Sequence, residues 1–317
     1  MDFLDTISWR LLCDNELSPY FRESSILILG NSEDERDGVI LGKLNENTSI
    51  VNINFDVDSS ILDIKFNGSE EYNIEHDNDP VSHADNLVTF LISCNKQIII
   101  DITSFSTETL FILLNAFYEN NYDKILVIYV EPIEYKLNRD RTFPNFHLSE
   151  GRLGISSIPG FLRLTDYEKE SKLLVFLGFE GGRFQELCEH LLTEGTVDIN
   201  PILPLPSYMA GWHMQGLYHN LETLKTNEVM SQVKRVTAWD PFLAYKVLEE
   251  QYNQFSDDHQ LMVAPLGTKP HTLAVVLFAI KYEDVQIMYD HPTKTKHRSS
   301  GIGKVRGYML EGFLDIS

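Results

Sequence analysis

A Gly/Thr/Lys loop late in the chain carries residue types suited to binding an anion. The loop, residues 265–271, follows an apolar run at 260–264 and precedes a second apolar run at 272–280, which predicts a buried helix. A strand that leads through such a loop into a helix presents free backbone N–H groups and the positive end of the helix dipole to a ligand. The spacing is not that of a Walker phosphate-binding loop. The predicted phosphate ligands are Gly267, Thr268, Lys269 and His271.

A similar strand–loop–helix pattern occurs earlier in the chain. Residues 98–114 align without a gap with residues 261–277. Three further landmarks recur in the same order, each roughly 150–160 residues apart. They are 26–30 with Glu33-x-x-Arg36 against 173–178 with Glu180-x-x-Arg183, Asp79-Pro80 against Asp240-Pro241, and 128–132 against 288–292. Four landmarks in register indicate a duplicated α/β unit.

The first copy of the loop adds a hydroxyl-and-carboxylate group to the prediction. Asp101, Thr103 and Ser104 leave the strand at 98–102, so we expect a divided site in which they face the cation of the second copy. The alternative is helix capping, because Ser, Thr and Asp satisfy unpaired N–H groups at such turns. Three carboxylates at strand ends are candidates for acid/base catalysis. They are Asp101, Glu131 and Asp290.

Two further groups near predicted strand ends fit a nucleotide. In Glu180-Gly181-Gly182-Arg183, the paired glycines let a ligand approach the backbone, and the arginine suits bidentate binding of an anion. The alternative is an ion pair between Glu180 and Arg183 at i, i+3. Tyr208 and Trp212, in an aromatic loop, predict a stacking surface for a base, with core packing as the commoner fate of such residues.

Strands alternating with helices place these residues on an α/β fold of two Rossmann-like lobes from an internal duplication, with mostly parallel sheets. We expect residues 1–165 to form the first lobe, with an acidic hairpin insertion around Asn67-Gly68, and residues 166–317 to form the second. A short helix is predicted at 37–44, and a Pro-interrupted strand at 199–205 predicts a sheet edge or bend. Ligands of open sheets bind beyond the strands' carboxyl ends, which predicts a site in the cleft between the lobes.

Composition narrows the function classes. The chain has 317 residues and a net charge of −21, which disfavours broad nucleic-acid binding because phosphate contacts require cations. Two basic clusters stand out, one with Lys136, Arg139, Arg141 and Arg152, the other with Lys294, Lys296, His297, Arg298, Lys304 and Arg306. Three scattered cysteines, no signal peptide and no membrane-length apolar run predict a cytoplasmic protein. No metal-ligand spacing, dinucleotide fingerprint or nucleophile elbow occurs, so the sequence indicates no particular metal or cofactor.

Three short segments together carry a resemblance to known proteins: Gly267-Thr268-Lys269-Pro270-His271, Asp101-Ile102-Thr103-Ser104 and Gly178-Phe179-Glu180. It resembles Rossmann-like proteins of bacterial anti-phage defence loci and is loosely similar to the nucleotide-sensing Rossmann domains of CRISPR accessory proteins. The resemblance implies a nucleotide-binding or nucleotide-sensing protein with a protein partner in a complex. The chain departs from the pattern by carrying both lobes and no nuclease domain. The alternatives are a nucleotide hydrolase or glycosidase, and a non-catalytic scaffold or adaptor.

Overall fold

The computed structural model describes residues 11–313 except 23, 32–33, 69–76, 136, 139–144, 147, 165, 167, 193–194, 256–258 and 296–297. The chain divides into two compact units, one comprising Met1–Glu134 and Ser299–Ser317, the other Tyr135–Arg298. This division differs from the expected boundary at 165/166. Residues 135–165 group with the second unit because β9 (Ser149–Arg152) pairs there with β15 (Pro292–Lys294). The C-terminal strand groups with the first unit because it pairs with that unit's sheet.

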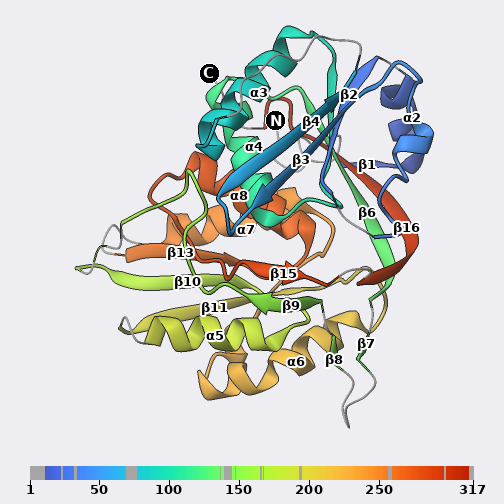
Figure 1. Ribbon diagram of the computed structural model, residues 1–317. Coiled ribbons are helices and arrows are strands. Elements are labelled where there is room, and N and C mark those ends of the chain that lie inside the picture. Colours follow the sequence, from blue (N-terminus) through green and yellow to red (C-terminus); the bar gives the residue numbers. More distant parts are fainter. Residues whose placement is uncertain are drawn as a thin grey trace. The chain divides into compact units, whose positions relative to one another are not determined.

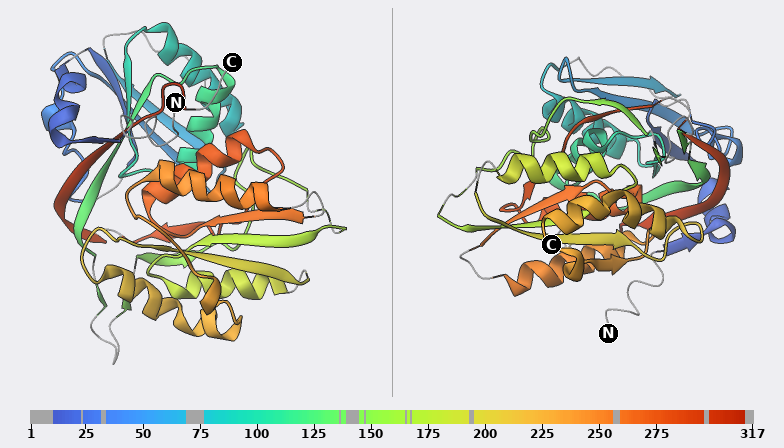
Figure 2. Two further views of the ribbon diagram at one scale, coloured as in Figure 1. Left: turned by 180° about the vertical axis from the view of Figure 1, so that it is seen from behind. Right: turned by 90° about the horizontal axis from the view of Figure 1, so that it is seen from below.

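Among the described residues, the first unit contains a seven-stranded sheet in the order β1-β16-β6-β5-β2-β3-β4. The parallel pairs are β2/β3, β2/β5 and β5/β6, whereas β1/β16 and β3/β4 are antiparallel. The strands span β1 Leu11–Cys13, β2 Ser25–Leu29, β3 Ser49–Asp56, β4 Ile61–Asn67, β5 Gln97–Asp101, β6 Ile125–Tyr135 and β16 Ser299–Met309. Both views of Figure 2 show β16 running beside β6. Leu310 N donates to Ile125 O, while Gly303 lies against Glu131 O, so these two strands run antiparallel.

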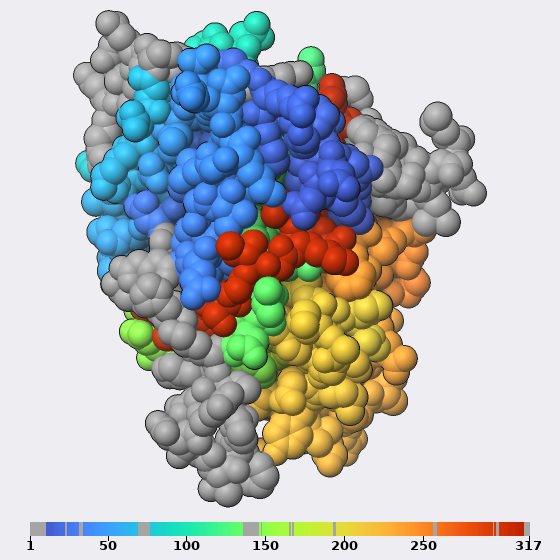
Figure 3. All heavy atoms as spheres, turned by 90° about the vertical axis from the view of Figure 1, so that its right-hand side faces the viewer, coloured from blue at the N-terminus to red at the C-terminus, as the bar shows by residue number. Residues whose placement is uncertain are grey.

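In the described part of the first unit, three helices cover this sheet: α2 (Asp14–Arg22), α3 (Pro80–Ser93) and α4 (Thr107–Glu119). Buried side chains of α2, Leu17 and Phe21, pack with Leu27, Ile99 and Leu126 of the sheet. In Figure 3, the red surface of β16 lies beside the blue surface of the N-terminal segments, with which it pairs and packs. The strand order therefore places β1 and β16, the first and last strands of the described chain, side by side in one sheet.

One predicted element of the first unit is wrong. Residues 37–44 form turns and a short 3-10 helix, Leu41–Lys43, instead of an α-helix, because Gly38 adopts a left-handed φ of +79°. The first strand of the predicted acidic hairpin is β4, which pairs with the preceding β3 across residues 57–60. Residues 69–76, which would hold the rest of the predicted hairpin, lie outside the described residues.

The second unit contains, among its described residues, a wholly parallel five-stranded sheet in the order β12-β11-β10-β13-β14. The strands span β10 Glu170–Phe176, β11 Val197–Pro204, β12 Lys234–Val236, β13 His259–Pro265 and β14 Gln286–Ile287. The Pro-containing strand β11 is interior, so its predicted edge position is wrong. Its neighbour β12 pairs only with residues 202–204, so Pro201 faces no partner on that side and its missing N–H costs no ladder bond.

Helices cover both faces of this sheet. Figure 1 shows α5 (Gly181–Leu192) and α6 (Trp212–Thr226) on one face and α7 (Pro241–Gln254) and α8 (Lys269–Lys281) on the other. Phe184 and Leu187 of α5 pack on Leu173 and Val175 of β10. Between β6 and β10, the chain forms β9 and two short strands, β7 (Leu137–Asn138) and β8 (Asn145–Phe146).

The two sheets share a strand order. Numbered by position along the chain, β6-β5-β2-β3-β4 and β14-β13-β10-β11-β12 both read 5-4-1-2-3. They differ in that β4 is antiparallel and β12 is parallel. The expected α/β class with mostly parallel strands is confirmed. Within the part of the chain that the structure describes, no helix is long and apolar enough to span a bilayer.

Candidate functional site

The loops that follow β11, β12 and β13 converge on two carbonyl groups in the second unit. Thr268 caps α8, accepting from His271 N, and its hydroxyl donates to Ala238 O at 2.7 Å. Tyr208 Oη donates to the same carbonyl at 3.0 Å. His271 Nε2 lies 2.9 Å from Thr237 O. The predicted residues Tyr208, Thr268 and His271 therefore come together at the carboxyl ends of neighbouring strands.

His271 is fully buried in the first turn of α8. Because a carbonyl only accepts, Nε2 must carry the proton, which leaves Nδ1 as an acceptor. Among the described residues, Nδ1 has no hydrogen-bond partner. Burial lowers the pKa of His271 to about 4, although the hydrogen bond to Thr237 opposes this effect. The ring is therefore neutral at physiological pH.

Glycines allow the loops after β10 and β13 to approach each other. A Cβ atom on Gly178 would lie 2.2 Å from Leu266 O, and one on Gly267 would lie 3.1 Å from Phe176 Cβ. A Cβ on Gly181 would lie 1.8 Å from His219 O. Backbone packing within the unit therefore explains these three glycines without a ligand. Lys269 is half-buried as the first residue of α8.

An aromatic cluster lies beside these loops. The Trp212 ring lies 5.2 Å from Tyr135, 5.6 Å from Phe179 and 6.5 Å from Tyr208 between centroids. Phe179 also stacks on Phe146 at 4.3 Å. Tyr208 and Trp212 are half-buried. This partial burial fits both alternatives for the aromatic loop, packing within the protein and stacking of a base.

Arg183 reaches across the strand ends to Asp290 instead of pairing with Glu180. Its Nε and Nη2 donate to the two carboxylate oxygens at 2.8 and 2.5 Å, and its guanidinium lies 5.6 Å from the Tyr289 ring centroid. Burial alone would lower the pKa of Arg183, but the hydrogen bonds and charge of Asp290 outweigh it and raise the pKa. The i, i+3 interpretation of Glu180 and Arg183 is wrong.

Glu180 holds a neighbouring segment. Its carboxylate accepts from Leu148 N at 3.1 Å, Ser149 N at 3.0 Å and Ser149 Oγ at 2.5 Å. Sequence reasoning missed Ser149, because no local pattern marks a hydroxyl whose partner is 31 residues away. It also missed Asn220, whose Nδ2 donates to Gly178 O at 2.8 Å and fixes the loop after β10.

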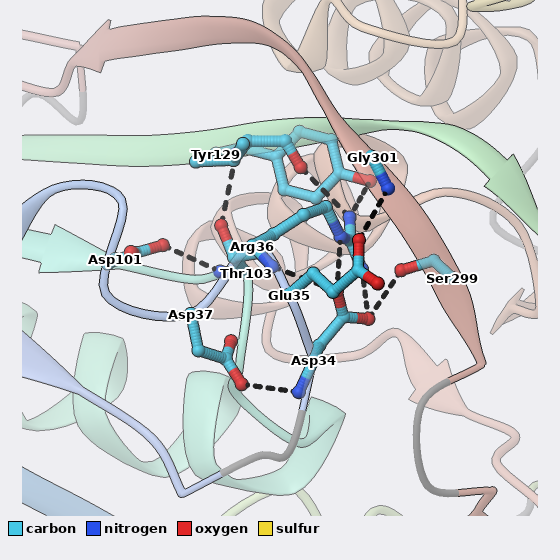
Figure 4. A network of polar contacts seen from close by, with 10 residues as sticks. Asp34, Glu35, Arg36, Asp37, Asp101, Thr103, Tyr129, Ser299 and Gly301 are labelled. Carbon is cyan, nitrogen blue, oxygen red and sulfur yellow. Dashed lines mark hydrogen bonds and ion pairs between the residues drawn. The ribbon is translucent and has the colours of Figure 1, made fainter.

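A buried arginine organises the corresponding loop of the first unit (Figure 4). Arg36 donates to Asp34 through Nε and Nη2, both at 3.0 Å, and to Val130 O at 2.9 Å. Its guanidinium lies 5.9 Å from the Tyr129 ring centroid. Burial alone would raise the pKa of Asp34, but the hydrogen bonds and charge of Arg36 outweigh it and lower the pKa to about 2.

Asp101 is a buried carboxyl group at the end of β5. It accepts from Thr103 N at 3.0 Å. Burial raises the pKa of Asp101 to about 6, opposed by the Thr103 hydrogen bonds and increased slightly by the charge of Asp37. Thr103 Oγ1 accepts from Val130 N, and Ser104 Oγ accepts from Gly30 N, so both hydroxyls fix strand-end turns.

The other carboxylate candidates have cationic partners. Glu131 is buried with Arg306 at 2.7 Å, and Asp290 is bound by Arg183. Of the basic clusters, Arg152 pairs with Glu186 at 2.9 Å. Lys136, Arg139, Arg141, Lys296 and His297 lie outside the described residues. Within the described ranges, no group of three or more His, Cys, Asp or Glu side chains is arranged to hold a metal ion.

Comparison with known proteins adds no family to this description. No family model matches the chain, and no curated protein matches it.

Proposed function

We propose that this protein binds or senses a nucleotide, with the phosphate-bearing ligand at the carboxyl ends of β10 and β13. One observation carries the proposal: strand order reverses beside β10, whose successor β11 lies on one side while β13 lies on the other. The loops after β10 and β13 meet there, at Gly178 and Leu266. In open parallel sheets, such a reversal point is where ligands bind.

The residues around this point divide into phosphate and base contacts. Lys269 and the positive end of the α8 dipole offer positive charge to a phosphate. Thr268 positions this turn through its bond to Ala238 O. The half-buried rings of Trp212 and Tyr208 offer a surface for stacking a base. Arg183 takes a positioning role, since Asp290 occupies both arms of its guanidinium fork.

Correspondences between the two units support this assignment. Both units have the same strand order, and an Asp-Pro pair begins α3 and α7 alike, with Asp79 and Asp240 as caps. The two matched arginines lie over matched tyrosines, Arg36 over Tyr129 and Arg183 over Tyr289. The nucleotide-sensing Rossmann domains that the chain loosely resembles also act as two lobes, although this chain departs from them by carrying both lobes itself. We therefore include cyclic oligonucleotides among the ligands to test.

Lys269→Ala tests the proposal, with Lys281→Ala at the other end of α8 as the matched control. Binding of mononucleotides, dinucleotides and cyclic oligoadenylates is measured by titration calorimetry and by thermal shift. We expect at least one probe to bind the unmodified chain. Because Lys269→Ala removes a charge-assisted contact, we expect it to weaken that binding at least about tenfold.

The control separates the site from the overall charge of the protein. Lys281 lies 3.8 Å from Glu249 and is partly exposed, so Lys281→Ala should change affinity by less than about twofold. Trp212→Phe should retain binding, and Trp212→Ala should lose it. Failure of every probe to bind, or equal affinity of Lys269→Ala and the unmodified chain, would contradict the proposal.

A further inference from the structure

A second short motif recurs at a fixed spacing. His-x-Ser-x-Gly occurs at residues 147–151 and again at residues 297–301, an interval of 297 − 147 = 150. The first copy follows β6, and the second follows β14, the strand in the same place in the order of its sheet. We call the segments that contain the serine and glycine, residues 148–152 and 298–302, the first arm and the second arm.

The serine of the second arm binds an acidic loop of the first unit. Ser299 is buried, and its Oγ donates to Asp34 Oδ2 at 2.5 Å. Gly301 N donates to Glu35 Oε2 at 2.9 Å (Figure 4). Gly301 has a φ of +72°, and a Cβ atom there would lie 2.9 Å from Ile133 Cβ. The glycine is therefore required both for its backbone conformation and for its close approach to β6.

The serine of the first arm makes the same kind of contact in the second unit. Ser149 Oγ donates to Glu180 Oε2 at 2.5 Å, and Ser149 N donates to Oε1 of the same carboxylate at 3.0 Å. Leu148 N adds a third bond at 3.1 Å. In the second unit, one carboxylate, that of Glu180, therefore accepts both the serine hydroxyl and backbone N–H groups of a Ser-x-Gly segment. In the first unit, two adjacent carboxylates share these donors, since Asp34 accepts the hydroxyl and Glu35 accepts the N–H.

The receiving carboxylates lie in corresponding turns, one alignment position apart, because Glu180 aligns with Glu33, the residue before Asp34. Asp34 follows the first parallel strand of its unit, β2, and Glu180 follows β10. Each is followed within three residues by an arginine that lies over a tyrosine, Arg36 over Tyr129 of β6 and Arg183 over Tyr289, two residues after β14. The receptor is thus an acidic turn whose backbone is fixed by a buried arginine.

We propose that this acidic turn is a docking site for a Ser-x-Gly segment and that the two halves of the sequence exchange their arms. The first arm continues from the last parallel strand of the first unit but belongs to the second unit, and the second arm passes in the opposite direction. Each receptor is occupied by the arm of the other half. The segment that fits the receptor has an extended backbone and a serine that is followed two residues later by a glycine. This inference does not depend on a nucleotide ligand.

Charge explains why the contact is selective. The acceptors are carboxylates and the donors are a hydroxyl and backbone N–H groups, and charge-assisted bonds of this kind are about twice as strong as neutral ones. The arms also extend local sheets. Gly151 pairs with Thr293 in β9/β15, and the second arm leads into β16, which pairs with β1 at Arg306 and Gly307.

Hydrogen exchange on the full chain tests the proposal with Ser149→Ala and Ser299→Ala. Loss of a charge-assisted bond should increase exchange of the affected arm about tenfold or more. Ser149→Ala should act on residues 148–152 and leave residues 299–309 unchanged, and Ser299→Ala should do the reverse. The matched controls are Ser157→Ala, close to the first arm, and Ser300→Ala, within the second arm. Ser157 is exposed and Ser300 is partly exposed, so neither substitution should change the exchange of either arm.

A chimeric arm tests the equivalence of the two docking sites. Leu148→Arg combined with Glu150→Ser gives the first arm the intervening residues of the second. If the receptors are equivalent, exchange of residues 148–152 should stay within about twofold of the unmodified chain, since the docking serine and glycine remain. Loss of protection in this chimera, or unchanged arm protection in Ser149→Ala and Ser299→Ala, would overturn the proposal.

Discussion

Buried charged side chains in this protein mostly neutralise one another. Arg183 binds Asp290, Arg36 binds Asp34 and Arg306 binds Glu131. Leaving any of these charges buried without its partner is costly, so the pairs fix strand-end loops before a ligand is considered. Two of the three carboxylates predicted for catalysis are occupied in this way. Asp101 instead accepts hydrogen bonds from Thr103, and burial raises its pKa, which is common for functional carboxyl groups.

At the residue scale, Asp101→Asn should stabilise the protein above pH 6. The pKa of Asp101 is about 6 when folded and 3.8 ordinarily, so the folded state keeps its proton to higher pH than the unfolded state. The contribution of this group to the free energy of unfolding therefore falls by at most about 3 kcal/mol as pH rises from about 4 to about 6, and it stays low above pH 6. Urea unfolding at several pH values measures the difference.

The exposed Asp58 provides the control for this effect. Asp58→Asn should leave the pH profile unchanged, whereas the advantage of Asp101→Asn should vanish below about pH 4. A gap between Asp101→Asn and the unmodified chain that is independent of pH would show that burial of the ionised carboxylate is not its cause.

Helix starts and close turns set the geometry of the site at the element scale. Asp79, Ser106, Asp240 and Thr268 each accept a backbone N–H as the cap of α3, α4, α7 or α8. These caps are the alternative that the sequence left open for the Ser, Thr and Asp residues at strand-to-helix turns. In α8, His271 N and Thr272 N are bonded to the Thr268 side chain and carbonyl, and Pro270 has no N–H, so this helix end offers a ligand its dipole.

Gly178→Ala should destabilise the second unit by about 1–3 kcal/mol, the usual cost of overpacking. Its Cβ would lie 2.2 Å from a backbone oxygen, Leu266 O, so the loops after β10 and β13 must separate. Gly182→Ala is the matched control, since its Cβ would meet only the flexible Arg152 side chain, at 3.6 Å. In helix α5 that change should be neutral or stabilising by up to about 1 kcal/mol. Chemical denaturation of both variants measures the contrast, and equal stability would contradict it.

The whole molecule is built from two units, one of which is discontinuous in sequence. The chain leaves the first unit after Glu134 and returns to it at Ser299. The returning strand, β16, lies between β1 and β6. The C-terminus thus completes a sheet whose other strands were all made in the first half of the sequence.

Removing residues 299–317 should therefore disrupt the first unit and spare the second. The deletion separates β1 from β6 and leaves Glu131 buried without Arg306. Hydrogen exchange should show lost protection in β2 and β5 and retained protection in β10 and β13. Uniform protection across both sheets after the deletion would contradict this expectation.

The sequence by itself determined the local elements and their type. Continuous apolar runs predicted buried parallel strands, and the apolar run at 272–280 predicted the buried helix observed as α8, because burial of an element depends on its neighbouring residues. It predicted Tyr208, Thr268 and His271 as site residues, and the strand order brings them together. The turn at 37–44 escaped prediction because Gly38 adopts a left-handed φ that an apolar pattern does not encode.

Only the tertiary structure determined which side chains and which strands contact one another. Arg183 binds a carboxylate 107 residues away, and Ser299 binds one 265 residues away. The interior position of β11 depends on where β12 stops, and the boundary between units depends on where β16 pairs. Such contacts form between segments that are distant in sequence, so no local spacing specifies them. The physical reason is that local preference selects an element, whereas packing of the whole chain selects its neighbour.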